Sequence, residues 1–437
     1  MTGIVLGLDQ GTSSTRCLVL DRELTQRGAA AVAVRASFPG PGLVEQDPDE
    51  LMASASSAIA DALAAAGATR KDVVALGIAN QTETFIVSER ASGRPVYPAI
   101  VWQDRRTADR CTALADAGYA RLVRARTGLE LDATFPATKV GWLLDHVNGA
   151  RAAAESGELV YDDVGAWLVS HLTGVHACEA GNAGRTLLCS LGGDDWDSEL
   201  LDLFGIPRAL LPPIVDSDAV ATAAPALTPA DLPVAAVLGD QQASLFGLGC
   251  RQPGAAKVTL GTGAFILAQA GATGPSPPPG VLASCAWRWQ GKTSYALEGF
   301  VPAAGSALDW FAGLGVLPPA SELDALLSTA GPEDGVVACV PALQGLGTPG
   351  WDPSVRAALV GLSRATTRAQ VARAVVDGVL HQVADALAAI NVVMPLATVL
   401  LDGGMSRSDG SCSGSPTSPT SGCNAPRGAR RQRSAPP

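Results

Sequence analysis

Residues 4–21 read IVLGLDQGTSSTRCLVLD, two apolar runs joined by a polar turn. The runs predict two β-strands, because both are rich in Val, Ile and Leu and are bounded by turn residues. The turn, Asp9-Gln10-Gly11-Thr12-Ser13-Ser14, offers a phosphate the close approach of a glycine backbone together with hydroxyl and N–H donors. The Asp9 carboxylate is suited to holding Mg²⁺ through water. A plain β-hairpin uses the same residue types, so the turn alone leaves both interpretations open.

The same strand–turn–strand pattern returns at residues 255–266, which read AAKVTLGTGAFI. Between the two hairpins, helix formers at 51–65 precede an apolar run at 73–79, which indicates alternating helices and strands and an α/β fold. The repeated hairpin predicts two similarly built domains that face one nucleotide. We place the boundary near Ser244, which gives domains at 1–244 and 245–409.

Asp240 follows the predicted strand 234–238 and precedes an apolar helix. One interpretation is an N-terminal helix cap, a common use of Asp. The other is a general base at the carboxyl edge of a sheet, where α/β proteins bind their ligands. Transfer of a phosphoryl group to a hydroxyl uses such a base, although positioning and charge neutralisation supply most of the rate.

The composition excludes some partners. The net charge is −11 and only four lysines occur, so we expect no nucleic-acid partner. No apolar run reaches the roughly 18 residues that a membrane span needs, and no secretion signal is visible, so we expect no membrane partner and a cytoplasmic protein. The 437 residues, 47% of them hydrophobic, suit two domains with ample cores.

Several further motifs complete a resemblance to the FGGY carbohydrate kinases, and to the glycerol kinases among them, over residues 3–409. In order, the matching stretches are GLDQGTSSTR at 7–16, GIANQTET at 77–84, AIVWQDRRT at 99–107, NAGRT at 182–186, GDQQA at 239–243, LGTG at 260–263, YALEG at 295–299 and WDP at 351–353. The resemblance implies a two-lobed, actin-like (ribonuclease H-like) kinase with ATP in the interdomain cleft and a small polyol or sugar as the phosphoryl acceptor.

The resemblance also implies roles for individual residues. Asp240 becomes the catalytic base and Asp9 the magnesium-associated acid. The nucleotide phosphates are assigned to Gly11, Thr12, Ser13, Arg16, Gly261 and Thr262, and the nucleotide side to Gly305, Gly403 and Gly404. The residues around the polyol are Thr82, Glu83, Trp102, Thr134, Asp240, Gln241 and Phe265.

Two positions depart from the glycerol kinase pattern. Thr82 stands where those kinases have an arginine, and Thr134 where they have a tyrosine. Both lost groups are substrate contacts in the family, so the change implies a roomier and less cationic pocket. Glycerol and a different small polyol or sugar both remain candidates, and the oligomeric state, with a homo-oligomer as one option, stays open.

Residues 410–437 depart from the family altogether. They contain no Leu, Ile, Val, Phe, Trp or acidic residue, and four arginines lie between 427 and 433. Such a composition predicts disorder, because it buries too little apolar surface to offset the entropy of ordering. A natural Ser/Pro linker is one interpretation. A frameshift explains more. If residues 410–426 are written in suitable GC-rich codons and a T is the missing base, reading from one base earlier gives WLVQRLADLADVGLQRP, which predicts an amphipathic helix and a loop like those the family has there.

Two functions follow. The first is ATP-dependent phosphorylation of a primary hydroxyl of a small polyol or sugar. The second is a catalytically impaired nucleotide- or sugar-binding remnant of such a kinase, whose second domain is incomplete. Asp240 favours the first, and the tail after Asp409 favours the second.

Overall fold

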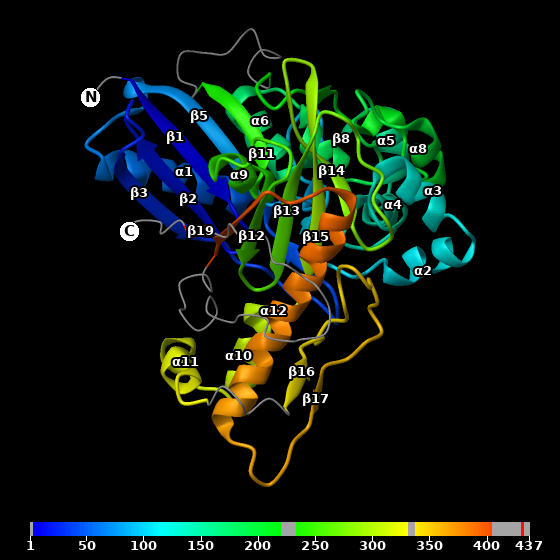
Figure 1. Cartoon of the computed structure of the whole chain (residues 1–437). Coiled ribbons are helices and arrows are strands. Elements are labelled where there is room, and N and C mark those ends of the chain that lie inside the picture. The colour runs from blue at the N-terminus through cyan, green and yellow to red at the C-terminus, as the bar shows by residue number, and fades with distance from the viewer. Residues whose placement is uncertain (1–2, 220–232, 331–336, 404–429, 432–437) are drawn as a thin grey trace. The chain divides into compact units, whose positions relative to one another are not determined.

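The computed structural model describes residues 3–219, 233–330, 337–403 and 430–431. The chain forms two compact units (Figure 1). The first unit comprises Met1–Ser244 and Ser284–Tyr295, and the second comprises Leu245–Ala283 and Ala296–Pro437. The first break therefore falls after Ser244, and the return of Ser284–Tyr295 to the first unit has no counterpart in the sequence prediction.

The first unit contains most of the helices and strands. Its strands are β1 (Ile4–Gln10), β2 (Ser14–Leu20), β3 (Gln26–Ala33), β4 (Glu45–Gln46), β5 (Val73–Asn80), β6 (Phe85–Glu89), β7 (Ala99–Ile100), β8 (Leu159–Asp163), β9 (Cys178–Glu179), β10 (Ile214–Val215) and β11 (Val234–Gly239). Its α-helices are α1 (Pro48–Ala65), α2 (Ala108–Asp116), α3 (Ala120–Thr127), α4 (Pro136–His146), α5 (Ala150–Glu155), α6 (Val164–Thr173), α7 (Ala180–Gly184), α8 (Ser198–Phe204) and α9 (Asp240–Gly247), which ends just beyond the break.

A five-stranded sheet organises the first unit, with strand order β11-β5-β1-β2-β3. β1 and β2 form the predicted antiparallel hairpin, while β1, β5 and β11 run parallel to one another. The second sheet has the order β4-β7-β6-β8. Alternation along β1 sends Ile4, Leu6 and Leu8 into the core and leaves the intervening residues less buried, as a half-buried strand requires.

Two helices cover the buried face of this sheet. α1 begins at Pro48, which suits the first helical position, and the Asp47 side chain accepts a hydrogen bond from the backbone N–H of Asp49. Side chains of α1 and α6 join Leu6, Leu8 and others of the sheet in one apolar cluster. The Trp167 indole of α6 also donates to the Pro48 carbonyl at 3.1 Å, which fixes the two helices to each other.

The second unit is built on another sheet, of order β14-β15-β13-β12-β18-β19. Its strands are β12 (Ala255–Leu260), β13 (Ala264–Gly271), β14 (Leu282–Trp289), β15 (Lys292–Val301), β16 (Ala338–Val340), β17 (Ala358–Val360), β18 (Thr398–Asp402) and β19 (Arg430–Arg431), and its helices are α10 (Gly305–Gly313), α11 (Ala320–Leu327) and α12 (Arg368–Val393). The tip of the β14–β15 hairpin is the segment that groups with the first unit.

Among the described residues, α12 is a helix long and apolar enough to cross a membrane by length and composition. Its buried side chains, among them Ala372, Val375 and Val376, instead join Phe311 and Leu323 of α10 and α11 in the apolar core of the second unit. A core helix of a globular protein meets the same criteria, and this packing fits that interpretation.

The predicted tail, 410–437, lies outside the described residues except for two positions. Arg430 and Arg431 form β19, which pairs in parallel with Leu400 and Leu401 of β18. Gly404, assigned above to the nucleotide side, also lies outside the described residues.

Candidate functional site

Three strand ends of the first unit bring the predicted catalytic segments to one place. Gln10 of β1 pairs with Asn80 of β5, and Asn80 pairs with Gly239 of β11. Because the three strands are parallel, their carboxyl ends share one edge of the sheet, where α/β proteins hold their ligands. The phosphate turn, the segment 81–84 and Asp240 all leave the sheet at this edge.

The turn between β1 and β2 is tight. The Gly11 N–H donates to the Ser14 carbonyl at 3.0 Å, and a Cβ on Gly11 would lie only 3.3 Å from that oxygen. Ser13 is exposed and Thr12 half-buried, so both offer polar groups at the surface of the turn. The turn therefore has the tight hairpin form that the sequence predicted.

Asp9 lies at the end of β1, directly across the hairpin from Arg16. Its side chain points to the less buried face of the sheet, yet desolvation by surrounding protein atoms raises the pKa of Asp9, while the Arg16 guanidinium opposes this shift. A lone carboxylate beside a phosphate turn suits Mg²⁺, which keeps several waters and takes one or two carboxylates together with substrate phosphates. Among the described residues, no three His, Cys, Asp or Glu side chains group as metal ligands.

A closed ring of hydrogen bonds connects the phosphate turn to Trp102. The Trp102 indole donates to Thr12 Oγ1 at 3.0 Å, and the Trp102 backbone N–H donates to Thr84 Oγ1 at 3.2 Å. The Thr84 hydroxyl donates to Gln81 Oε1 at 2.9 Å, and Gln81 Nε2 donates to Gln46 Oε1 at 3.0 Å. Gln46 Nε2 donates to the Thr12 carbonyl at 2.7 Å, which closes the ring. Five residues from four segments thus hold one another in place, and three of them, Gln46, Gln81 and Thr84, carried no predicted role.

Glu83 is engaged on both of its oxygens. Arg185 Nε donates to Glu83 Oε1 at 2.5 Å, and the Thr82 hydroxyl donates to Oε2 at 2.6 Å. The ion pair is largely buried, with the side chains 12% and 7% exposed. Glu83 also has φ of +61°, an uncommon conformation for a residue with a side chain and one found at functional sites. The lack of an arginine at 82 therefore does not leave Glu83 without a guanidinium, because Arg185 supplies one.

Two buried side-chain amides hold the helix that precedes Arg185. The side chains of Asn80 and Asn182 exchange two hydrogen bonds, of 3.2 and 3.1 Å, which join the end of β5 to α7. Arg185 directly follows α7, and its guanidinium also lies 5.4 Å from the centre of the Phe135 ring. The sequence offered one signal for this residue, its place in the NAGRT motif.

Asp240 is the first residue of α9, and the residue before it, Gly239, lies against Thr82. Its Oδ1 accepts the backbone N–H of Gln241 at 2.7 Å, and its Oδ2 lies 3.5 Å from Gln241 Nε2. A Cβ on the preceding residue, Gly239, would lie 2.5 Å from Thr82 Cγ2, so glycine allows the two segments to meet. The two interpretations of Asp240 are compatible, because a carboxylate at the start of a helix still presents oxygens to a ligand.

The Thr134 hydroxyl is turned toward its own loop. It donates to Asp132 Oδ1 at 2.7 Å, and the Thr134 N–H donates to the same oxygen at 2.8 Å. Asp132 in turn accepts from Arg105 Nη1 at 2.6 Å. Desolvation opposes ionisation of this carboxyl, but Arg105 and the Thr134 groups hold the pKa of Asp132 below its usual value.

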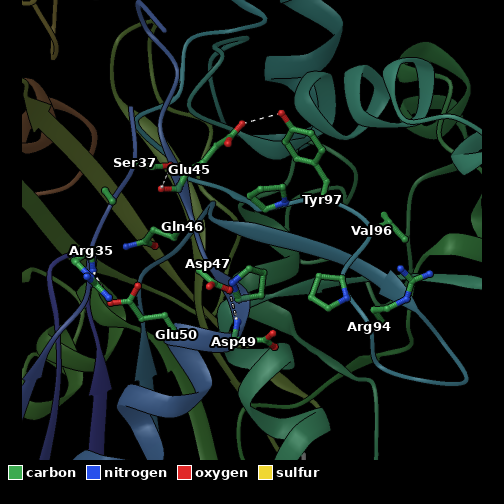
Figure 2. Close-up of a pocket in the computed structure, with 14 residues that line it drawn as sticks. Arg35, Ser37, Glu45, Gln46, Asp47, Asp49, Glu50, Arg94, Val96 and Tyr97 are labelled. Carbon is green, nitrogen blue, oxygen red and sulfur yellow. Dashed lines mark hydrogen bonds and ion pairs between the residues drawn. The ribbon is translucent and has the colours of Figure 1, made fainter. Parts of the chain in front are cut away.

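A surface pocket of about 780 Å³ opens near the start of α1, lined by 14 residues (Figure 2). Its polar groups largely pair with one another: Arg35 Nε donates to Glu50 at 3.1 Å, and the Tyr97 hydroxyl donates to Glu45 at 2.9 Å (Figure 2). None of these 14 residues is a predicted site residue, and Gln46 is the member that also belongs to the hydrogen-bonded ring. The pocket is therefore distinct from the predicted polyol site.

The second unit gathers the residues predicted for the nucleotide side. The Gly305 N–H, at the start of α10, donates to the Gly261 carbonyl at 2.9 Å, and the Ala304 and Ser306 N–H groups both donate to the Thr262 carbonyl. Gly403 has φ of +91° and lies so close to Leu260 that a Cβ would be 2.4 Å from its carbonyl oxygen. The four described glycine and threonine positions thus meet at the β12–β13 turn.

Phe265 also lies in the second unit, on β13. Its ring packs against Phe300 with centroids 5.0 Å apart, and Phe300 lies 6.4 Å from Trp351. Both neighbours come from outside the strand, so this aromatic group depends on the fold of the whole unit.

Comparisons with known proteins agree with this arrangement. The N-terminal domain model of the FGGY family of carbohydrate kinases matches residues 4–247, and the C-terminal domain model matches residues 256–413. The chain is 46% identical to a glycerol kinase of Aromatoleum aromaticum over 411 residues, 93% of this chain and 83% of that enzyme. It is also 46% identical to the glycerol kinase of Thermus brockianus over 410 residues, with the same coverage.

Among solved structures, Plasmodium falciparum glycerol kinase with ADP matches with a TM-score of 0.85 and 27% identity, over 94% of this chain and 83% of that one. The match confirms the predicted α/β class and its two domains of the actin-like kinase fold.

Proposed function

Since the chain belongs to the FGGY family of carbohydrate kinases, we propose that it transfers the γ-phosphoryl group of ATP to a primary hydroxyl of a small polyol, as a kinase of the glycerol kinase type. One observation carries the proposal beyond the family. The candidate base, Glu83 and the phosphate turn all leave one sheet edge of the first unit, at the ends of parallel strands, and Arg185 reaches Glu83 from the end of α7. This arrangement suits a reaction in which a hydroxyl is held between a base and a phosphate.

In this proposal Asp240 accepts the proton of the attacking hydroxyl. Its Oδ1 receives the Gln241 N–H, which fixes the orientation of the carboxylate. Glu83 and Trp102 orient the polyol, and Gln241 and Phe265 complete the polyol contacts. Arg185 and the Thr82 hydroxyl hold the Glu83 carboxylate in one orientation, which reduces the motion of the proposed polyol contact.

We propose that the protein binds the nucleotide phosphates through backbone N–H and hydroxyl groups more than through charged side chains. Gly11, Thr12 and Ser13 provide N–H and hydroxyl donors in the first unit, with Arg16 as the nearby cation. Gly261, Thr262, Gly305 and Gly403 form the corresponding turn of the second unit, and Gly404 belongs to the same proposal. Asp9 would hold Mg²⁺ through water, and the ion would neutralise phosphate charge.

The identity of the polyol is a separate part of the proposal. The relatives at 43–46% identity are named glycerol kinases, which favours glycerol. Thr82 and Thr134 favour a different polyol, because their hydroxyls bond to Glu83 and Asp132 and add no cation or phenol. We propose that the pocket accepts glycerol less well than a larger polyol. We also propose that the protein is a cytoplasmic enzyme with domains at 1–244 and 245–409. Both a monomer and a homo-oligomer are compatible with this proposal.

An ATP-coupled assay over a panel of polyols and sugars tests the proposal. We expect turnover with at least one small polyol, dependent on Mg²⁺ and on Asp240. ATP binding without turnover on any member of the panel would instead favour the impaired remnant. Turnover with glycerol far above every larger polyol would reject the altered pocket while keeping the kinase.

A further inference from the structure

Lys139 is a buried cation that the proposed mechanism does not use. It lies in the first turns of α4, and its side chain is 0% exposed. Its Nζ donates to the Thr134 carbonyl at 2.9 Å and to the Val101 carbonyl at 3.2 Å. Thr134 is a proposed polyol residue, and Val101 directly precedes Trp102. One ammonium group therefore joins the backbones of the two loops that carry proposed polyol contacts.

This placement is unfavourable for the lysine in two ways. Burial of an ammonium removes its hydration, and the start of a helix carries partial positive charge. Desolvation lowers the pKa of Lys139 to about 8, against the opposing charges of Asp104, Glu83 and Asp132, while Arg105 adds to the lowering. Each of these three acids has an arginine of its own, namely Arg106, Arg185 and Arg105 in that order. Lys139 is thus bonded to backbone carbonyls, and the acids act on it only at longer range.

Other hydrogen bonds of the described residues lie within each loop or further from Trp102 and Thr134. The Val101 carbonyl also receives the Asp104 N–H at 3.0 Å, within its own loop. The Thr134 groups bond to Asp132, again within the loop, and Arg105 reaches across to Asp132 through an ion pair that is partly exposed. The buried Thr107 and Thr138 hydroxyls, 2.8 Å apart, also join the first loop to α4. The bonds from Lys139 are buried and end on the Val101 and Thr134 carbonyls themselves, so their loss should let these two backbones move apart.

We propose that Lys139 is a positioning residue that sets the spacing between Trp102 and Thr134 in the polyol site. The inference rests on the proposed function, which assigns those two residues to the polyol. In this proposal Lys139 contacts neither the polyol nor the nucleotide. Its ammonium group affects polyol affinity through the Val101 and Thr134 carbonyls.

The test compares Lys139→Met, which keeps the length of the side chain and removes its donors, with Lys71→Met, which removes an exposed lysine of the first unit. We expect KM for the polyol to rise tenfold or more in Lys139→Met, with KM for ATP within twofold of the parent. Lys71→Met should match the parent in both. An unchanged KM for the polyol, or an equal rise in both KM values, would overturn the proposal.

Hydrogen exchange provides a readout that does not need activity. In Lys139→Met, amides in 101–107 and 132–135 should exchange faster than in the parent, while those of β1 and β5 keep their protection. If the parent phosphorylates no polyol, the proposed function fails, and faster exchange in both loops still supports the positioning role. Unchanged exchange in both loops overturns it. Lys139→Gln, which keeps one shorter donor group, serves as the second variant if the methionine variant does not fold.

Discussion

The indole N–H of Trp102 donates to the Thr12 hydroxyl at 3.0 Å, although the two residues lie 90 positions apart in the chain. This bond joins a proposed polyol contact to the proposed phosphate turn. The rate of a phosphoryl transfer depends on how the acceptor hydroxyl is positioned against the phosphate. A direct bond between the residue proposed to bind the polyol and the turn proposed to bind the phosphate should therefore affect the rate.

Trp102→Phe keeps an aromatic ring and removes the N–H donor. We expect kcat/KM for the polyol to fall about fivefold, since one hydrogen bond is worth about 1 kcal/mol. Steady-state kinetics measures the change, with Trp289→Phe, an exposed tryptophan of the β14–β15 hairpin, as the matched control. If kcat/KM for the polyol were the same in Trp102→Phe and in the control, the bond from Trp102 to Thr12 would not contribute to the reaction.

Asp240→Asn keeps the shape of the side chain and removes the base. Turnover should fall by roughly 10²–10⁴-fold while ATP binding stays close to that of the parent, because general-base catalysis contributes on that order. Single-turnover kinetics and nucleotide titration check the two halves separately. Asp61→Asn, on the exposed side of α1, is the control. Turnover within about tenfold of the parent would remove Asp240 from the role of base.

Thr82→Arg restores the side chain that the glycerol kinase pattern has at this position. If Thr82 shapes the pocket, the ratio of kcat/KM for glycerol to that for a larger polyol should increase several-fold. Thr82 is 9% exposed and packs against Gly239, so the larger side chain has to point toward the ligand side. Thr82→Ser, which keeps the hydroxyl bond to Glu83, is the control. A ratio unchanged by Thr82→Arg would contradict this role.

Arg185→Gln removes the guanidinium that holds Glu83. The buried carboxylate then keeps only the Thr82 hydroxyl, which costs about 1–3 kcal/mol. We expect kcat/KM for the polyol to fall by roughly 10–100-fold, with a smaller effect on the KM for ATP. Arg151→Gln, at an exposed ion pair with Asp145, provides the control. Loss of ATP affinity equal to the loss of polyol affinity would place Arg185 outside the polyol site.

Glu179 gives the first unit a pH-dependent stability. Burial raises the pKa of Glu179 from 4.5 to about 7, and the Asp163 charge adds to the shift. The folded state therefore binds this proton more tightly than the unfolded state, so the contribution is most favourable below about pH 4.5 and is lost as pH rises through about 7.

The free energy of unfolding should thus decrease between pH 5 and pH 8, by roughly 1–3 kcal/mol from this group. Urea denaturation across this range measures it. Glu179→Gln should flatten the dependence, whereas Glu155→Gln, at an exposed position on α5, should not. An equal slope in parent and Glu179→Gln would contradict the assignment.

Local sequence predicted much of the framework. The β1–β2 hairpin, β5, α1 and β11 follow from apolar runs and turn residues, and their observed bounds differ from the predicted ones by only a few residues. Asp240 could be found because it stands at a strand end, which is a local feature.

The supporting bonds could not be predicted in the same way. Arg185 reaches Glu83 across 102 positions, and Lys139 reaches Val101 across 38. Such pairs depend on how strands and helices pack, and no local period encodes them. The sequence showed that position 82 lacks an arginine, but it could not show that Arg185 lies against Glu83.

The ring formed by Thr12, Trp102, Thr84, Gln81 and Gln46 has an evolutionary consequence. Trp102 donates two of the five bonds and Thr12 accepts two, while Thr84, Gln81 and Gln46 each accept one bond and donate one. A first substitution that removes one of these groups opens the ring, and a second then removes a bond that the open ring has already weakened. Epistasis between these five positions should be strong. Laboratory evolution toward a new acceptor would therefore find few single-step improvements there, and libraries that vary the five codons together would be the productive ones.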